Sequence, residues 1–197
     1  MNDYEKIIQI ALQNQNMFKT KMVVDAGIRK ERIKELLEQE KIERIGHGFY
    51  TLRENRSDKY FELQQRCPKA IFSYATSAYL LGLLEQAPAV FDCTVPRGYN
   101  TSRLNLNEKV QYHYVLEEYY PIGLTEYKTP YGTTVQIYDR ERTICDFVKH
   151  RRKIDPQLYS AVLNAYFKSR EKEIRKLARY GRIFHVIKEL EMYMEVL

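Results

Sequence analysis

The sequence of 197 residues contains no tryptophan, few cysteines and no long apolar segment. Its three cysteines, Cys67, Cys93 and Cys145, lie far apart, without a Cys-x-x-Cys pair or a nearby histidine, which excludes a disulfide framework and a zinc site. The longest apolar run, residues 78–84, is too short to cross a bilayer. The N-terminus lacks the basic start and apolar stretch of a signal peptide. These absences predict a cytoplasmic protein without a membrane partner.

Glycine and proline are also scarce, with 8 and 6 residues, which excludes collagen-like and low-complexity sequences. Hydrophobic residues make up 44% of the chain and aromatic residues 13%, including 17 tyrosines, so the composition excludes disorder as well. A chain of this length forms one large domain or two small ones. We expect it to bury about 70% of the surface that its unfolded form exposes.

The net charge of +6 and the isoelectric point of about 9.1 suggest a polyanionic partner. The charges are unevenly distributed along the chain. Residues 1–55 contain 10 basic and 9 acidic residues, whereas residues 140–188 contain 14 basic and 5 acidic residues. The excess of positive charge therefore lies in one C-terminal stretch.

Residues 1–55 have the pattern of a winged helix-turn-helix, in which three helices precede a β-hairpin. The first helix, capped by Asn2 or Asp3, has apolar residues at i, i+3, i+4, i+7 and i+8, and these are Tyr4, Ile7, Ile8, Ala11 and Leu12. Thr20 is expected to cap a second, short helix. A third helix over residues 29–40 and a hairpin over residues 42–52 complete the module.

Residues 56–197 predict a larger mixed domain, separated from the first near Asn55 by a polar linker. Helices are expected over residues 58–66 and 73–81. The β-rich stretches that follow predict a small, largely antiparallel sheet, and they are residues 90–95, 110–115, 124–128 and 133–138. From Asp139 to the C-terminus the pattern is helical again. The predicted fold class is therefore α+β, with C-terminal helices.

In a helix-turn-helix, the N-terminal part of the third helix contacts base edges in the major groove. Arginine suits this position because its planar fork matches guanine O6 and N7. The amides after Thr20 and the wing of the hairpin are expected to contact phosphates. The predicted DNA-binding residues are Thr20, Lys21, Arg29, Lys30, Arg32, Lys34, Arg44 and His47. The alternative for the charged third helix is an ordinary solvated face.

The basic C-terminal stretch is expected to form either a DNA clamp that neutralises phosphates or a surface for another acidic partner. A solvated helix face is the third possibility. The residues concerned are Arg151, Arg152, Lys153, Lys168, Lys172, Arg175, Lys176 and Arg179. The residues from Lys168 onward recur at intervals of three or four, so several of them are expected to lie on the same face of a helix.

The sequence contains no motif that predicts catalysis. The four histidines lack metal-ligand spacing, and there is no phosphate-binding loop or nucleophile elbow. The clustered carboxylates Asp139, Glu141 and Asp146 are better explained by structure, with Asp139 as a helix N-cap and Asp146 paired with a neighbouring arginine. We therefore predict that the protein is not an enzyme, with no catalytic residues, cofactor or metal.

Four motifs occur in order along the chain: the wing Gly46–Tyr50 (GHGFY), and residues 73–83, 94–97 and 135–147. In these motifs the chain resembles the AbiE-type antitoxins (AbiEi family), the transcriptional regulators of type IV toxin-antitoxin pairs linked to abortive phage infection. The resemblance implies an N-terminal domain that represses its own operon at inverted repeats. It also implies a C-terminal domain that counteracts a nucleotidyltransferase-like toxin without a stable complex. The third helix and the wing are the parts to which this family assigns a role.

Two other interpretations remain open. One is a ligand-sensing winged-helix repressor unrelated to toxin neutralisation, with a small molecule held by the mixed domain. The other is a DNA-processing enzyme that uses the carboxylates from Asp139 to Asp146. No sustained heptad seam is visible, so the chain is expected to be a monomer in solution, with two copies placed on the repeats.

Overall fold

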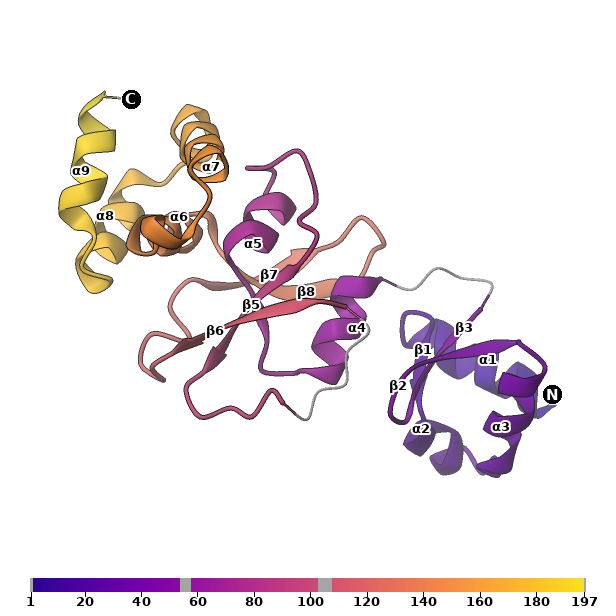
Figure 1. Ribbon diagram of the computed structural model, residues 1–197. Helices are drawn as coiled ribbons and strands as arrows, with labels where there is room; N and C mark the ends of the chain where they lie inside the picture. Colours follow the sequence, from indigo (N-terminus) through magenta and orange to yellow (C-terminus); the bar gives the residue numbers. More distant parts are fainter. Residues whose placement is uncertain (1, 54–57, 103–107, 197) are drawn as a thin grey trace. The chain divides into compact units, whose positions relative to one another are not determined.

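The computed structural model describes residues 2–53, 58–102 and 108–196 (Figure 1). The chain divides into two compact units. The first comprises Met1–Pro68, Ser102–Asn107 and Pro130–Thr133, and the second comprises Lys69–Thr101, Glu108–Thr129 and Thr134–Leu197. The predicted boundary between residues 55 and 56 lies outside the described residues.

Helices and a small antiparallel sheet form the first unit. In chain order its elements are α1 (Asp3–Gln13), β1 (Met17–Lys19), α2 (Thr20–Asp25), α3 (Glu31–Glu38), β2 (Ile42–Gly46), β3 (Phe49–Leu52) and α4 (Lys59–Arg66). Strand β3 lies between β1 and β2 and pairs antiparallel with both. The predicted order of three helices followed by a hairpin is therefore present, and β1 adds a third strand to the hairpin.

The first helix begins as the sequence predicts, but its apolar face is narrower. The Asn2 side chain accepts a hydrogen bond from the Glu5 amide at 2.8 Å, and the Glu5 carboxylate accepts one from the Asn2 amide at 2.8 Å. Ile7 and Ala11 are fully buried, whereas Leu12 is 58% exposed. The prediction for Leu12 was wrong because Leu12 lies outside the face of the helix that packs on the core, to which Tyr4, Ile8 and Ile10 also contribute.

Two predicted boundaries in the first unit were also wrong. Thr20 does not cap α2: it is the first helical residue, Lys19 holds the cap position, and the Thr20 amide donates to the Gly48 carbonyl oxygen at 2.9 Å. The third helix begins two residues later than predicted. Gly27, with φ of +76°, turns the chain, and the buried Ile28 anchors the segment that leads into α3.

A mixed sheet forms the base of the second unit. Among the described residues its strand order is β6-β5-β4-β8-β7, with β4 (Ile71–Phe72), β5 (Phe91–Pro96), β6 (Val110–Val115), β7 (Leu124–Lys128) and β8 (Thr134–Tyr138). The pairs β5–β6 and β4–β8 are parallel, and β4–β5 and β7–β8 are antiparallel. The prediction of a largely antiparallel sheet was therefore wrong. It missed β4, whose two residues are too short to show a strand pattern.

The remaining elements of the second unit are helices: α5 (Tyr74–Leu80), α6 (Arg140–Lys149), the 3₁₀ turn η1 (Arg151–Lys153), α7 (Pro156–Lys168), α8 (Ile174–Ile183) and α9 (Ile187–Val196). Helix α5 packs on β5 and on α6, and α6 packs in turn on α7 and α8. The segment drawn from orange to yellow in Figure 1 gathers these last helices beside α6. None of the described helices is long and apolar enough to span a membrane.

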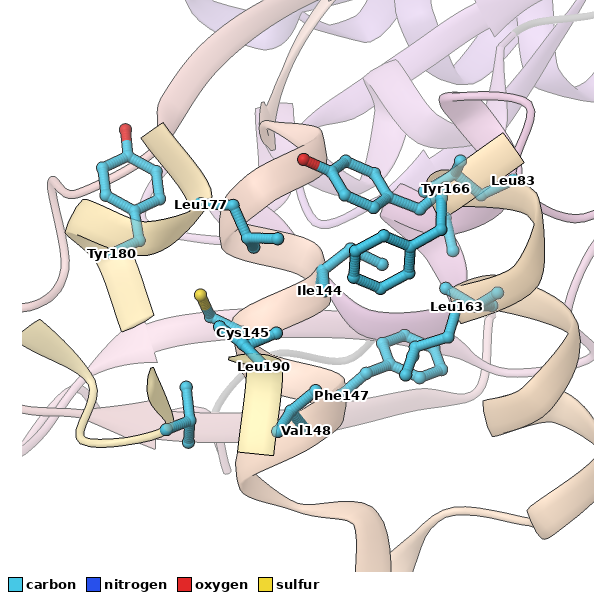
Figure 2. Packing of buried hydrophobic residues seen from close by; sticks show 14 of the residues in the cluster. Leu83, Ile144, Cys145, Phe147, Val148, Leu163, Tyr166, Leu177, Tyr180 and Leu190 are labelled. Atoms are coloured by element: carbon cyan, nitrogen blue, oxygen red, sulfur yellow. The ribbon is translucent and has the colours of Figure 1, made fainter. Parts of the chain in front are cut away.

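The core of the second unit surrounds α6. Ile144, Cys145 and Phe147 of this helix are fully buried, and Figure 2 shows them among Tyr166 of α7 and Leu177 of α8. Every residue from Glu141 to Val148 is buried, including three charged ones. Buried charges are costly unless they are paired, so the contacts of these side chains decide how this helix is held.

Candidate nucleic-acid interface

The segment between α2 and α3 presents two cations to solvent. Ile28 is buried and its amide donates to the Val23 carbonyl oxygen at 3.1 Å, which fixes the chain just before the exposed Arg29 and Lys30. Within the described part of the chain, neither Arg29 nor Lys30 forms an ion pair. Both side chains therefore keep their hydrogen-bond donors for an external acceptor.

Two other predicted contacts on α3 are engaged within the helix. The Arg32 guanidinium pairs with the Glu35 carboxylate, and the Lys34 ammonium lies 3.9 Å from the Glu38 carboxylate. Such exposed pairs contribute about 0 to 1 kcal/mol, so a phosphate or a base can displace them at small cost. Because Glu35 and Glu38 pair with the two cations of α3, the unpaired positive charge lies just before the N-terminus of the helix, at Arg29 and Lys30.

The wing carries a second small group of basic residues. The Arg44 Nε donates to the Gly46 carbonyl oxygen at 3.2 Å, and the Arg44 Nη2 lies 3.3 Å from the His47 Nδ1. Both residues are exposed. The structure therefore brings these two predicted residues together at the tip of the hairpin. Lys21 is also exposed, on α2, and forms no ion pair with a described residue.

Most cations of the predicted clamp are exposed on the second unit. Arg151, Arg152 and Lys153 form the exposed turn η1, and Arg175 and Arg179 lie four residues apart on the exposed side of α8. Arg182, another exposed residue of the basic C-terminal stretch, continues this stripe. The signal that locates it is its spacing of seven and three residues from Arg175 and Arg179, which places all three on one helix face.

Three other residues of that set are placed near helix ends or within a cluster. Lys168 is exposed at the end of α7, and the Lys172 ammonium donates to the Phe167 carbonyl oxygen, one of the free carbonyls at that helix end. Lys176 differs from all the others because it is 24% exposed and lies among carboxylates. Its ammonium is 3.1 Å from Asp139 and 3.3 Å from Glu141.

This acidic surrounding removes Lys176 from the basic surface. Its ammonium also lies 3.2 Å from the Glu173 carboxylate. Burial opposes the charged form of Lys176, but the hydrogen bond to Asp139 and the charges of Asp139 and Glu141 raise its pKa. The Lys176 ammonium thus joins α8 to the start of α6 through these ion pairs. The prediction that Lys176 belongs to an exposed basic surface was wrong.

The carboxylates considered for a DNA-processing enzyme have structural partners. Asp139 caps α6 by accepting the Arg142 amide at 2.8 Å, and both oxygens of Asp146 accept from the Arg142 Nε at 3.0 Å. These two contacts confirm the structural roles predicted for Asp139 and Asp146. Burial raises the pKa of Asp146, and the Arg142 charge opposes that rise. Glu141 accepts from the Tyr166 hydroxyl at 3.0 Å.

No group of three His, Cys, Asp or Glu side chains is arranged to hold a metal ion anywhere in residues 2–53, 58–102 or 108–196. The exposed arginine and lysine side chains described above are the groups available to an external ligand. They are suited to phosphates, which accept charge-assisted hydrogen bonds from arginine and lysine.

A family model matches part of the first unit. Residues 5–53 match the family described as "Transcriptional regulator, AbiEi antitoxin". The match covers α1 through β3, the segment that contains Arg29, Lys30 and the wing. It confirms the resemblance to AbiEi antitoxins in the N-terminal part of the chain. A search of curated proteins gave no match.

The fold extends beyond that segment in a solved structure. The crystal structure of the RV2827C protein from Mycobacterium tuberculosis is similar to this chain, with a TM-score of 0.65 and 13% sequence identity. The similarity covers 89% of this chain and 69% of that chain. At this level of identity the likeness shows the fold alone. Both units of the present chain therefore follow a known arrangement of elements.

Proposed function

We propose that this protein is the antitoxin of a type IV toxin-antitoxin system and the repressor of its own operon. The observation that carries the proposal is the match of residues 5–53 to the AbiEi regulator family, over a segment that folds as helices followed by a hairpin. In this proposal Arg29 and Lys30 enter the major groove of an inverted repeat, and Arg44 and His47 contact a flanking phosphate. The protein acts in the cytoplasm as a monomer that binds each half-site once.

The C-terminal part completes the proposal in two ways. The η1 turn and the α8 stripe add phosphate contacts, because residues 140–188 have 14 basic and 5 acidic residues whereas residues 1–55 have 10 and 9. The second unit also counteracts a nucleotidyltransferase-like toxin without a stable complex. Its carboxylates support no enzymatic role of their own, since Asp139 and Asp146 are engaged within the protein.

Binding to promoter DNA tests the first half of the proposal. A duplex with the inverted repeat from the chain's own promoter should be bound more tightly than a scrambled duplex at the same salt concentration. The double variant Arg29→Ala and Lys30→Ala should lose most of that preference, whereas Lys128→Ala on β7, an exposed lysine of the second unit, should not. Equal affinity of the unmodified protein for both duplexes would refute the proposed operator binding.

Co-expression tests the second half. Expression of the nucleotidyltransferase-like protein encoded beside this gene should arrest growth, and this chain should restore it. Absence of such a neighbouring gene, or rescue equal to that of an empty vector, would refute the antitoxin role and leave a DNA-binding regulator. A ligand-sensing repressor is the second candidate, because the second unit contains a cavity of about 590 Å³.

A further inference from the structure

The cavity of the second unit is lined by residues of α5, β5, β6 and α6, together with the segment from η1 into α7. Its volume is about 590 Å³, within the range of about 300 to 1,000 Å³ usual for small-molecule sites. The wall contains the charged side chains of Asp92, Lys153 and Asp155, and the two histidines His113 and His150. The hydrogen bonds that these five residues already make within the protein decide which groups remain for a ligand.

His150 contributes a hydrogen-bond acceptor to the cavity. Its Nδ1 lies 3.2 Å from the Asp146 carbonyl oxygen and 2.8 Å from the Tyr74 hydroxyl. Because a carbonyl oxygen can only accept, Nδ1 carries the ring proton and donates to this carbonyl and to the Tyr74 hydroxyl oxygen. Partial burial lowers the pKa of His150, which favours the neutral ring. The Nε2 of that ring is therefore an acceptor, and no described residue donates to it.

His113 and the two carboxylates contribute further acceptors. The His113 Nε2 donates to the Asp92 Oδ1 at 2.8 Å, so the Nδ1 of the neutral ring is an acceptor. The Asp155 Oδ1 accepts the amides of Gln157 and Leu158 at 2.9 and 3.0 Å. The second carboxylate oxygen of Asp92, and that of Asp155, has no hydrogen-bond partner in the part of the chain that the structure describes.

The wall consequently presents more negative than positive charge. Its two carboxylates each keep one oxygen for a ligand, and the two imidazoles add one nitrogen acceptor each. Lys153 opposes them with an ammonium, which is exposed and forms no ion pair with a described residue, so it can turn toward solvent. A positively charged N–H donor is the complement of such a wall, because charge-assisted hydrogen bonds are the stronger ones.

The rest of the wall indicates the body of the ligand. Tyr114 and Phe147 add aromatic rings, whose faces attract cations and pack on planar groups. A metal ion fits this wall poorly, because no three His, Cys, Asp or Glu side chains within the described ranges are arranged to hold one. We propose that the cavity binds a small aromatic amine in its protonated form, with its charge balanced by Asp92 and Asp155 and its ring against the aromatic wall. This site goes beyond the proposed function, which requires no ligand.

Titration of the full chain with defined probes at neutral pH tests this site. Benzylamine and tyramine serve as aromatic amines, benzyl alcohol as a neutral analogue of nearly the same shape, and benzoate as an anion. Isothermal titration calorimetry measures binding, and the ring ¹⁵N signals of His113 and His150 report its location. We expect saturable binding of at least one amine, with a shift of the His150 Nε2 signal. Benzyl alcohol should bind about tenfold more weakly than benzylamine, and benzoate should not saturate the site.

Isosteric variants test the two carboxylates. Asp92→Asn should weaken binding of the amine about tenfold, and Asp155→Asn about threefold, because Asp155 is exposed whereas the Asp92 side chain is 18% exposed. Asparagine keeps an oxygen for His113 in the first variant and for the start of α7 in the second. Glu191→Gln on α9, at an exposed residue outside the cavity, is the control and should leave binding unchanged.

Lys153→Ala provides a change in the opposite direction. It removes a positive charge from the wall and should tighten binding of the amine about threefold. The amide spectrum of each variant shows whether the fold is retained.

Any of four results would overturn the proposal: no saturable binding of either amine, equal affinity for benzylamine and for benzyl alcohol or benzoate, losses in the aspartate variants no larger than in Glu191→Gln, or weaker binding in Lys153→Ala. The test needs neither DNA nor a toxin. Its outcome is therefore independent of the proposed antitoxin function.

Discussion

Arg142 is the largest fully buried side chain of the described structure. Its Nη1 donates to the carbonyl oxygens of Tyr119 and Ile122 at 2.8 and 2.9 Å, and its Nε donates to Asp146. The guanidinium also lies over the rings of Tyr138 and Phe184, at 4.2 and 4.0 Å from their centroids. One side chain thus joins the loop before β7, the sheet and the C-terminal helices.

Removing this arginine should destabilise the protein strongly. We expect Arg142→Met to lower the free energy of unfolding by about 3–5 kcal/mol, because Asp146 then stays buried without a counter-charge. The double variant Arg142→Met and Asp146→Leu should lose less than the two single variants combined. Urea unfolding of the four proteins measures both. Strictly additive losses would show that the pair has no coupling.

Glu35 forms an ion pair with Arg32, which is predicted to contact base edges. This pair occupies the guanidinium that would otherwise be available to DNA. Glu35→Gln should release the guanidinium and tighten binding to the promoter duplex, whereas Arg32→Ala should weaken it by about 1–3 kcal/mol and relax sequence preference. Glu126→Gln on β7, at an exposed glutamate of the second unit, removes the same charge away from the predicted DNA contacts and is the control. An equal loss of Arg32→Ala on promoter and scrambled duplexes would instead make Arg32 a phosphate contact.

His150 should give the stability of the protein a pH dependence. Partial burial lowers its folded-state pKa below the ordinary value of 6.5, against the opposing influence of Asp146. As the pH falls below about 7, the unfolded chain takes up a proton at His150 before the folded protein does, so the free energy of unfolding falls. Lys149 and His113 add to the depression of the pKa.

His150→Gln should lose less stability than the unmodified protein when the pH is lowered from about 7.5 to about 5.5, since glutamine cannot titrate. Urea unfolding at both pH values measures the difference. Parallel losses in the two proteins would assign the pH dependence to other groups.

At the scale of elements, sequence patterns predicted most helices and the longer strands because each has its own apolar period. They could not predict β4, which is two residues long, or the parallel pairs β5–β6 and β4–β8, because strand order depends on residues far apart in the chain. For the same reason no local pattern reveals that Lys176 lies among carboxylates, or that Tyr74 brings His113 and His150 to one cavity. The outward positions of Arg29 and Lys30 could be predicted because they follow from the local turn.

The η1 turn and α8 offer two separable sets of cations. Replacing Arg151, Arg152 and Lys153 with alanine should reduce the slope of log affinity against log salt by roughly 2–3 units, at about 0.9 unit for each phosphate contact. Discrimination between promoter and scrambled duplexes should change little. The matched triple variant of Arg175, Arg179 and Arg182 tests the α8 stripe in the same way. An unchanged slope together with lost rescue from the toxin would assign the η1 turn to the antitoxin function.

For the whole molecule, charge distribution predicts a division of labour. Residues 1–55 have a net charge of +1, from 10 basic and 9 acidic residues, whereas residues 140–188 have +9, from 14 and 5. A chain that ends after Pro68 should therefore retain sequence preference but lose much of its affinity, as measured by fluorescence anisotropy at several salt concentrations. Full affinity in the shortened chain would show that the C-terminal cations do not contact DNA.

The parallel pairing of β4 with β8 has a consequence for synthesis on the ribosome. Phe72 pairs with Ile137, so this part of the sheet cannot form until 65 further residues have been made. At about 5–20 residues per second that takes roughly 3–13 seconds. The pairs of β1, β2 and β3 all lie between residues 17 and 52, and contacts this local close quickly. The helix-and-hairpin segment can thus be folded while the central strand of the second unit still waits for its partner, which leaves Ile71 and Phe72 exposed to chaperones or to aggregation during that interval.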